Sequence, residues 1–102
     1  MTDLSQGDLI RVKGVRPLLL VASKNAFIRA TGMVHACPVL ENEAKGPLHI
    51  PIEGVKGTRG VVACEHVKLI DPASRGCRRM DRIPYETLMD VSDAIQGMFE
   101  YD

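Results

Sequence analysis

Aromatic side chains are scarce in this sequence, whose 102 residues include no tryptophan, two tyrosines and two phenylalanines. Proteins that hold single-stranded nucleic acid without sequence preference commonly stack the bases on aromatic rings. This chain has few side chains for that mode of binding. Any nucleic acid that it recognises would therefore be held by charge and by the shape of a groove.

Cysteine is also rare, and long apolar runs are absent. The three cysteines (Cys37, Cys64 and Cys77) show no CxxC spacing, so neither a disulfide framework nor a zinc site is indicated. Cys37 and Cys64 lie inside apolar runs, where we expect small core residues. No apolar run approaches membrane-spanning length, and no signal peptide precedes the first predicted strand. We expect a cytoplasmic protein without a metal or cofactor.

Charge is balanced overall but unevenly distributed. The chain has 13 basic and 13 acidic side chains, yet residues 9–40 contain five basic side chains and no carboxylate. Residues 83–102 contain five carboxylates and no Lys or Arg. This asymmetry is compatible with a basic face for a polyanion and an acidic face elsewhere, and equally with charges spread for solubility.

Short apolar runs separated by turn residues predict an all-antiparallel β structure. The runs cover residues 9–12, 18–21, 33–40, 48–52 and 60–67, with 68–70 as a possible extension. Their spacing favours a small antiparallel sheet or barrel over alternating βαβ units. The first two runs form a hairpin that carries Arg16 at its turn. The length allows one domain, residues 1–102.

Two helices are predicted. Residues 23–27 could form one helical turn with Ser23 as its N-cap. Residues 72–82 are polar and basic, which predicts a surface segment with at most one short strand. Pro84 suits the first turn of a longer helix, and its apolar stripe predicts one face against the sheet: Leu88, Val91, Ile95 and Met98.

Several strings, in this order, resemble a known family. They are GDLI at 7–10, GVRPLLLV at 14–21, NAF at 25–27, Pro38-Val39, and GVVACEHVKLID at 60–71. Together they are similar to the MazF/PemK toxins of type II toxin–antitoxin systems. The resemblance implies a mainly β (α+β) fold of CcdB/Kid type, which is a small SH3-like antiparallel barrel of five to seven short strands with a C-terminal α-helix.

The same resemblance implies an activity and partners. The family's toxins inhibit growth as endoribonucleases that cleave single-stranded RNA without a metal, by attack of the substrate's own 2′-hydroxyl. The implied partners are single-stranded RNA, a second copy of the chain and a cognate antitoxin. A gyrase poison like CcdB shares the barrel but depends on a Trp-containing C-terminus, which this chain lacks.

Cleavage of this kind requires a base, an acid and a cation for the phosphate. Arg16, at the family's Gly-x-Arg-Pro position, fits the cation, because a guanidinium binds two phosphate oxygens at once. Glu65 and His66 replace the family's Asp-Gln and are candidates for proton transfer. In a regular strand only one of these two neighbours would face the groove. Further candidates for binding RNA are Lys13, Lys24, Arg59 and Lys68.

Other features depart from the family pattern. The loop before Gly14 is short, Leu40 stands where a threonine or serine is usual, and Ala63 stands where one branch has a second arginine. Loss of one positioned donor typically costs roughly 10²–10³ in rate. The alternative reading is therefore a catalytically impaired member that binds antitoxin or RNA. His35 is expected to be structural, and His49 belongs to no constellation visible in the sequence.

Overall fold

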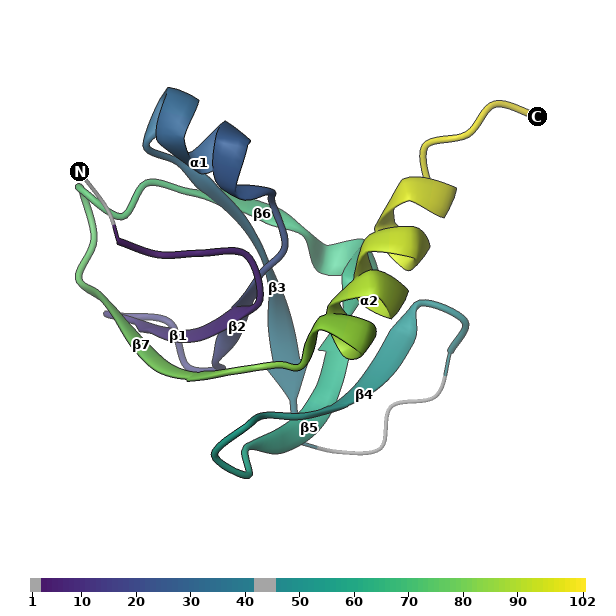
Figure 1. The fold of residues 1–102 in the computed structure, drawn as a ribbon, viewed down its shortest axis with the longest axis horizontal. Coiled ribbons are helices and arrows are strands. Elements are labelled where there is room, and N and C mark those ends of the chain that lie inside the picture. The colour runs from purple at the N-terminus through teal and green to yellow at the C-terminus, as the bar shows by residue number, and fades with distance from the viewer. Residues whose placement is uncertain (1–2, 42–45) are drawn as a thin grey trace.

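Residues 3–41 and 46–102 are described by the computed structural model (Figure 1). Within them, none of the helices is long and apolar enough to cross a membrane. The elements, in chain order, are β1 (Asp8–Val12), β2 (Leu19–Val21), α1 (Asn25–Thr31), β3 (Val34–Leu40), β4 (His49–Glu53), β5 (Arg59–Ala63), the short 3₁₀ helix η1 (Cys64–His66), β6 (Lys68–Ile70), β7 (Cys77–Arg82) and α2 (Tyr85–Gly97).

The seven strands of the described residues form one antiparallel sheet. Its order is β4-β5-β3-β2-β1-β7, and β6 pairs with the first half of β3, next to the half that pairs with β5. The predicted hairpin is present, with Leu9 opposite Leu20 and Ile10 opposite Leu19. This architecture confirms the predicted antiparallel β fold with a C-terminal helix.

The two ends of the strand order, β4 and β7, are brought together by the turn that follows β4. The backbone N–H of Val55 donates to Arg82 O at 2.8 Å. Asp81 of β7 is buried and accepts hydrogen bonds from the N–H groups of Lys56 (2.9 Å) and Thr58 (3.2 Å). One buried carboxylate therefore ties the last strand to the β4–β5 turn and closes the sheet on itself.

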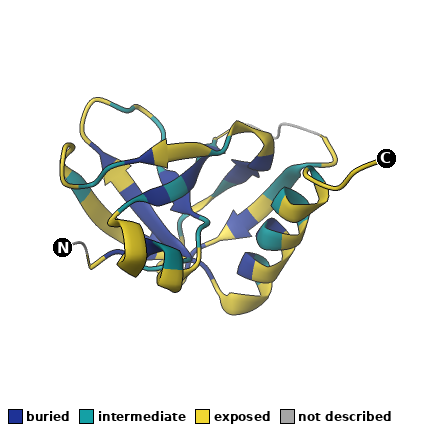
Figure 2. Cartoon of the chain, turned by 90° about the horizontal axis from the view of Figure 1, so that it is seen from above, coloured by how far each residue is buried: buried dark blue, intermediate teal, exposed yellow. Residues whose placement is uncertain are grey.

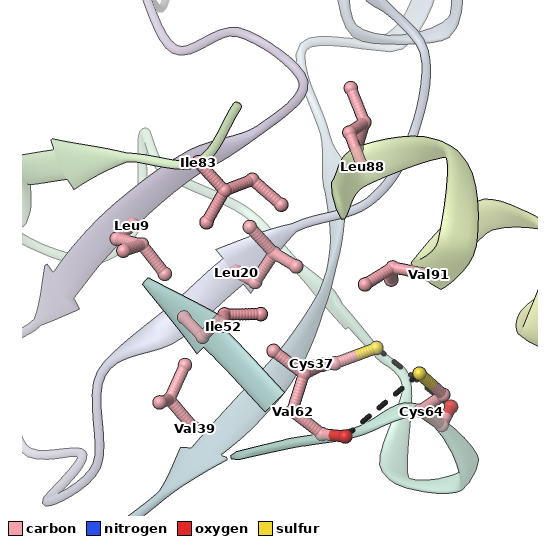
Figure 3. Close-up of a cluster of buried hydrophobic side chains, with 10 residues drawn as sticks. All are labelled: Leu9, Leu20, Cys37, Val39, Ile52, Val62, Cys64, Ile83, Leu88 and Val91. Carbon is pink, nitrogen blue, oxygen red and sulfur yellow. Dashed lines mark hydrogen bonds between the residues drawn. The ribbon is translucent and has the colours of Figure 1, made fainter. Parts of the chain in front are cut away.

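The core lies on both faces of the central strands. One cluster includes Leu9, Leu20 and Cys37 and reaches Leu88 and Val91 of α2 (Figure 3). The other contains the alternate residues of the same strands, packed around Ile28 of α1, and its members are Leu4, Ile10, Val12, Leu19, Val21, Val34, Ala36 and Ile70. Because both faces are covered, β2 is a continuous apolar run, and in β1 the consecutive residues Leu9 and Ile10 are both buried, with Arg11 as the exposed position.

Helix α2 confirms the predicted C-terminal helix, but it ends at Gly97, so Met98 of the predicted stripe lies at its C-cap. Leu88 and Val91 are buried, Ile95 packs against the same cluster, and the outward face is exposed (Figure 2). The predicted Ser23 N-cap is wrong. Helix α1 begins at Asn25, with Lys24 in the capping position, because the Ser23 hydroxyl instead accepts the backbone N–H of His35 at 2.9 Å.

Residues 72–82 are more than a surface segment. They contain β7, which pairs with β1 along its whole length with one irregularity between Leu9 and Ile10. The prediction of at most one short strand was right about the strand. The prediction missed that this strand is part of the barrel, because the charge of Asp81 suggested exposure to solvent although its side chain is buried.

Candidate active site

The arginine at the hairpin turn is fully available to a ligand. Strand β1 ends at Val12 and β2 begins at Leu19, and Gly14 in this connection has a φ of 84°. Arg16 is exposed, and its backbone carbonyl accepts a hydrogen bond from Arg11 Nη1. Among the described residues, nothing pairs with the Arg16 guanidinium. A free cation at a turn held by glycine and by a neighbouring arginine can bind an anionic ligand.

The regular strand predicted over residues 60–67 is wrong. Strand β5 ends at Ala63, and Cys64–His66 form the 3₁₀ helix η1. Cys64 is buried against Cys37, and its N–H donates to Leu48 O at 3.0 Å, which turns the chain away from the β5–β3 ladder. The alternation of a strand therefore does not apply to Glu65 and His66, and both side chains are accessible.

The turn of η1 places Glu65 between two histidines. Glu65 Oε2 lies 2.7 Å from His49 Nε2 and 4.0 Å from His66 Nε2. His49 is largely enclosed, with 16% of its side chain exposed, while 64% of the His66 side chain is exposed. The carboxylate is thus anchored by an enclosed histidine on one side and has a solvent-facing histidine on the other.

The electrostatics favour an ionised carboxylate at this position. A hydrogen bond from its own backbone N–H, and next the hydrogen bond from His49, hold the pKa of Glu65 below its ordinary value. Burial opposes this effect, and the charges of His49 and His66 add to it. His49 Nδ1 is buried and has no hydrogen-bond partner among residues 3–41 and 46–102.

His49 was missed by the sequence reasoning, although a signal for it existed. The β4–β5 hairpin has an unbroken antiparallel register, from Glu53 opposite Arg59 to His49 opposite Ala63. Extrapolating from the turn at Gly57 would have placed His49 beside the end of β5, next to Glu65. The short apolar run hid it, because a histidine at a strand end resembles any solvated residue.

The four basic candidates for RNA binding lie in different places. Lys13 follows β1 beside Arg16, and Lys68 opens β6 two residues after His66. Lys24 lines a groove of about 560 Å³ between the start of α1, β6 and the end of α2. Arg59 lies at the far end of β5 from Glu65, 3.4 Å from the exposed Glu53.

Arg16 and Glu65 lie on opposite sides of β3. The turn that carries Arg16 precedes β2, whose Leu19 is opposite Pro38 of β3, and η1 precedes β6, whose Lys68 is opposite Ala36 of β3. Among the described residues, no hydrogen bond or ion pair joins Arg16 to Glu65 or His66.

No group of three or more His, Cys, Asp or Glu in the described ranges has the arrangement needed to hold a metal ion. The candidate site residues are Glu65 with its two histidines at η1, and Arg16 with Lys13 at the hairpin turn. Carboxylate, imidazole and guanidinium are the groups that acid–base cleavage of a phosphodiester requires.

Comparison with known proteins identifies the family of this chain. Residues 2–99 match the family model described as PemK-like, MazF-like toxin of type II toxin-antitoxin system. The chain is similar to Endoribonuclease PemK of Escherichia coli, with 37% identity over 82 residues that span 76% of this chain and 60% of that protein. It thus matches somewhat less than two thirds of the length of this curated relative.

Solved structures show the same fold. A chain of the MazE–MazF crystal structure (Form-II) from Deinococcus radiodurans is similar with a TM-score of 0.84, 25% identity and complete coverage of both chains. An endoribonuclease from Mycobacterial species has a TM-score of 0.81 at 18% identity, covering 95% of this chain and 91% of that one. The chain belongs to the PemK-like, MazF-like family of toxins of type II toxin–antitoxin systems.

Proposed function

We propose that this protein is an endoribonuclease that cleaves single-stranded RNA without a metal. The observation that carries the proposal is the position of Glu65, which is accessible at η1 and lies 2.7 Å from His49, in a chain of this toxin family. Membership of the family, and the name of the PemK relative, favour the enzyme over the impaired binding module.

The reaction removes one proton from the 2′-hydroxyl of the substrate and adds one proton to the leaving 5′-oxygen. The substrate's 2′-oxygen attacks the adjacent phosphorus, the bond to the 5′-oxygen breaks, and the products end in a 2′,3′-cyclic phosphate and a 5′-hydroxyl. Glu65, oriented by His49, accepts the proton of the 2′-hydroxyl. His66, which is exposed beside it, protonates the leaving 5′-oxygen, and Arg16 stabilises the charge that grows on the phosphate.

The positions of Arg16 and Glu65 on opposite sides of β3, with no contact between them among the described residues, support a homodimer. We propose that Arg16 of one copy faces Glu65 and His66 of the other. A two-fold dimer would then contain two equivalent composite sites, each complete only when both copies are present.

The activity is tested with a mixed-sequence single-stranded RNA in excess EDTA. The parent protein is expected to give products that end in cyclic phosphate, and Arg16→Ala and Glu65→Gln to reduce kcat by about 10²-fold or more. Lys24→Ala removes a basic side chain from the groove beside β6 and α2 and measures how far the loss of one RNA-binding candidate lowers RNA binding without removing a proposed catalytic group. No cleavage by the parent at high concentration, with RNA still bound, would establish the binding module instead.

Mixing the two inactive variants tests the composite site. After subunit exchange, an Arg16→Ala/Glu65→Gln heterodimer has one site with neither substitution, and statistical mixing restores about a quarter of the parent activity. If both residues acted from the same chain, every site in the mixture would lack one of them. The mixture would then stay inactive although exchange had taken place, and the composite site would be rejected.

A cognate antitoxin is the remaining partner. The relatives from Deinococcus radiodurans are MazE–MazF complexes, and we propose that this chain likewise binds an antitoxin, in the cytoplasm where its RNA substrate lies. Co-expression with the adjacent reading frame should give a complex that does not cleave RNA. A neighbour that neither co-purifies with the chain nor suppresses cleavage would count against this assignment.

A further inference from the structure

Two strands far apart in the sequence place arginines side by side. Arg11 of β1 is directly opposite Arg78 of β7, so their side chains project from the same face of the sheet. Both are exposed. The Arg11 guanidinium also donates to the backbone carbonyl of Arg16, which connects this pair to the hairpin turn. Three cations therefore meet at one end of β1.

Two more basic side chains extend the group. The N–H of Lys13 donates to Gly76 O at 2.8 Å, so the pairing of β1 with β7 continues to the turn before β7. From that turn Arg75 reaches toward the hairpin, with its Nη2 3.9 Å from the position that a Cβ on Gly14 would take. We define the β1–β7 cationic face as Arg11, Lys13, Arg16, Arg75 and Arg78.

None of these five cations has a carboxylate partner within the part of the chain that the structure describes. The contrast with other arginines is clear, since Arg79 lies 3.2 Å from the buried Asp8 and Arg59 lies 3.4 Å from Glu53. Like charges directly opposite each other in a sheet are destabilising. An uncompensated group of this kind is typical of a surface that meets a polyanion.

We propose that the β1–β7 cationic face binds the phosphate backbone of single-stranded RNA on the nucleotides next to those held at Arg16. The inference rests on the proposed function and extends it to Arg11, Arg75 and Arg78. An acidic protein fits this face less well, because protein interfaces are centred on apolar anchors. Apart from Met80, the large exposed hydrophobic side chains lie in the β4–β5 turn, on β6, and on α2 and the chain after it.

The test measures binding of a 2′-O-methyl oligoribonucleotide, which cannot be cleaved because it lacks the attacking hydroxyl. Fluorescence anisotropy is recorded over a range of salt concentrations for the parent, for Arg11→Gln/Arg78→Gln, and for Arg29→Gln, an exposed arginine on α1. Each phosphate contact contributes about 0.7 to the slope of log K against log salt for a single strand. The double variant should lose about 1.4 from this slope and bind at least tenfold more weakly at about 0.1 M salt.

Arg29→Gln should match the parent, and the melting temperature of the double variant should stay close to that of the parent, because removal of the repulsive pair offsets loss of the hydrogen bond from Arg11 to Arg16 O. A double variant with parental affinity and slope, in a protein that cleaves RNA, overturns the inference and leaves the proposed function intact. Poly-glutamate, which stands for an acidic protein, is titrated in the same way. If the double variant loses binding of poly-glutamate while its binding of RNA is unchanged, the inference is overturned. If the parent binds the oligonucleotide through this face but never cleaves RNA, the inference holds and the proposed function fails.

Discussion

Replacing Asp81 by Asn should open the barrel where β7 meets the β4–β5 turn. Asp81 is 2% exposed, and its Oδ1 accepts the N–H groups of Lys56 at 2.9 Å and Arg82 at 2.7 Å. Its Oδ2 accepts the N–H of Thr58 at 3.2 Å. In asparagine one of the two carboxylate oxygens is replaced by an NH2 group, which cannot accept a hydrogen bond from a backbone N–H. Asp81→Asn therefore removes at least one hydrogen bond to a charged group.

The magnitude follows from the pKa of Asp81. Burial raises it, but the hydrogen bonds from Thr58, Lys56 and Arg82 more than offset this effect and lower the pKa from 3.8 to about 2. At ~1.36 kcal/mol per pKa unit, the ionised carboxylate contributes about 2 kcal/mol to the free energy of unfolding. Because the folded-state pKa is the lower one, this contribution is complete above about pH 5 and is lost as the pH falls toward 2.

Urea unfolding at pH 7 and at lower pH values measures this contribution. Asp81→Asn should lower the free energy of unfolding by about 2 kcal/mol at pH 7, which corresponds to roughly 10 °C in melting temperature for a domain of this size. The difference should shrink steadily below pH 4. Asp90→Asn, on the exposed face of α2, is the matched control and should change stability by less than ~0.5 kcal/mol. A deficit for Asp81→Asn that stays constant down to pH 2.5 would refute the electrostatic account.

Two further predictions concern packing and thiol reactivity. Gly60→Ala should destabilise the fold by ~2 kcal/mol or more in urea unfolding, because its Cβ would lie 2.5 Å from a side-chain carbon of Val39 in β3. Gly97→Ala, whose Cβ would have nothing within 4 Å, should be neutral or stabilising. Equal effects of the two substitutions would contradict the reasoning. Burial raises the pKa of the Cys37 thiol to about 12. An aromatic disulfide reagent at pH 8 should therefore modify only the partly exposed Cys77 in the folded protein. Mass spectrometry that showed Cys37 modified first would be evidence against the packing described.

Local patterns in the sequence were sufficient for much of the fold. The stripe at Leu88, Val91 and Ile95 predicted α2 because a helix brings residues three and four apart onto one face. Apolar runs between turn residues predicted the strands, and the string around Arg16 placed that arginine at a hairpin turn. Each of these inferences depends on residues close together in the chain.

Tertiary structure decided the rest. The buried Cys64 ends β5 and creates η1, and only the register of β4 against β5 brings His49 to Glu65. Asp81 read as a surface charge until β7 was placed against the β4–β5 turn. Arg11 and Arg78 are 67 positions apart and became neighbours only through the β1–β7 pairing. Backbone hydrogen bonds between strands are the same for any side chain, so which distant strands pair depends on packing of the whole core rather than on local sequence.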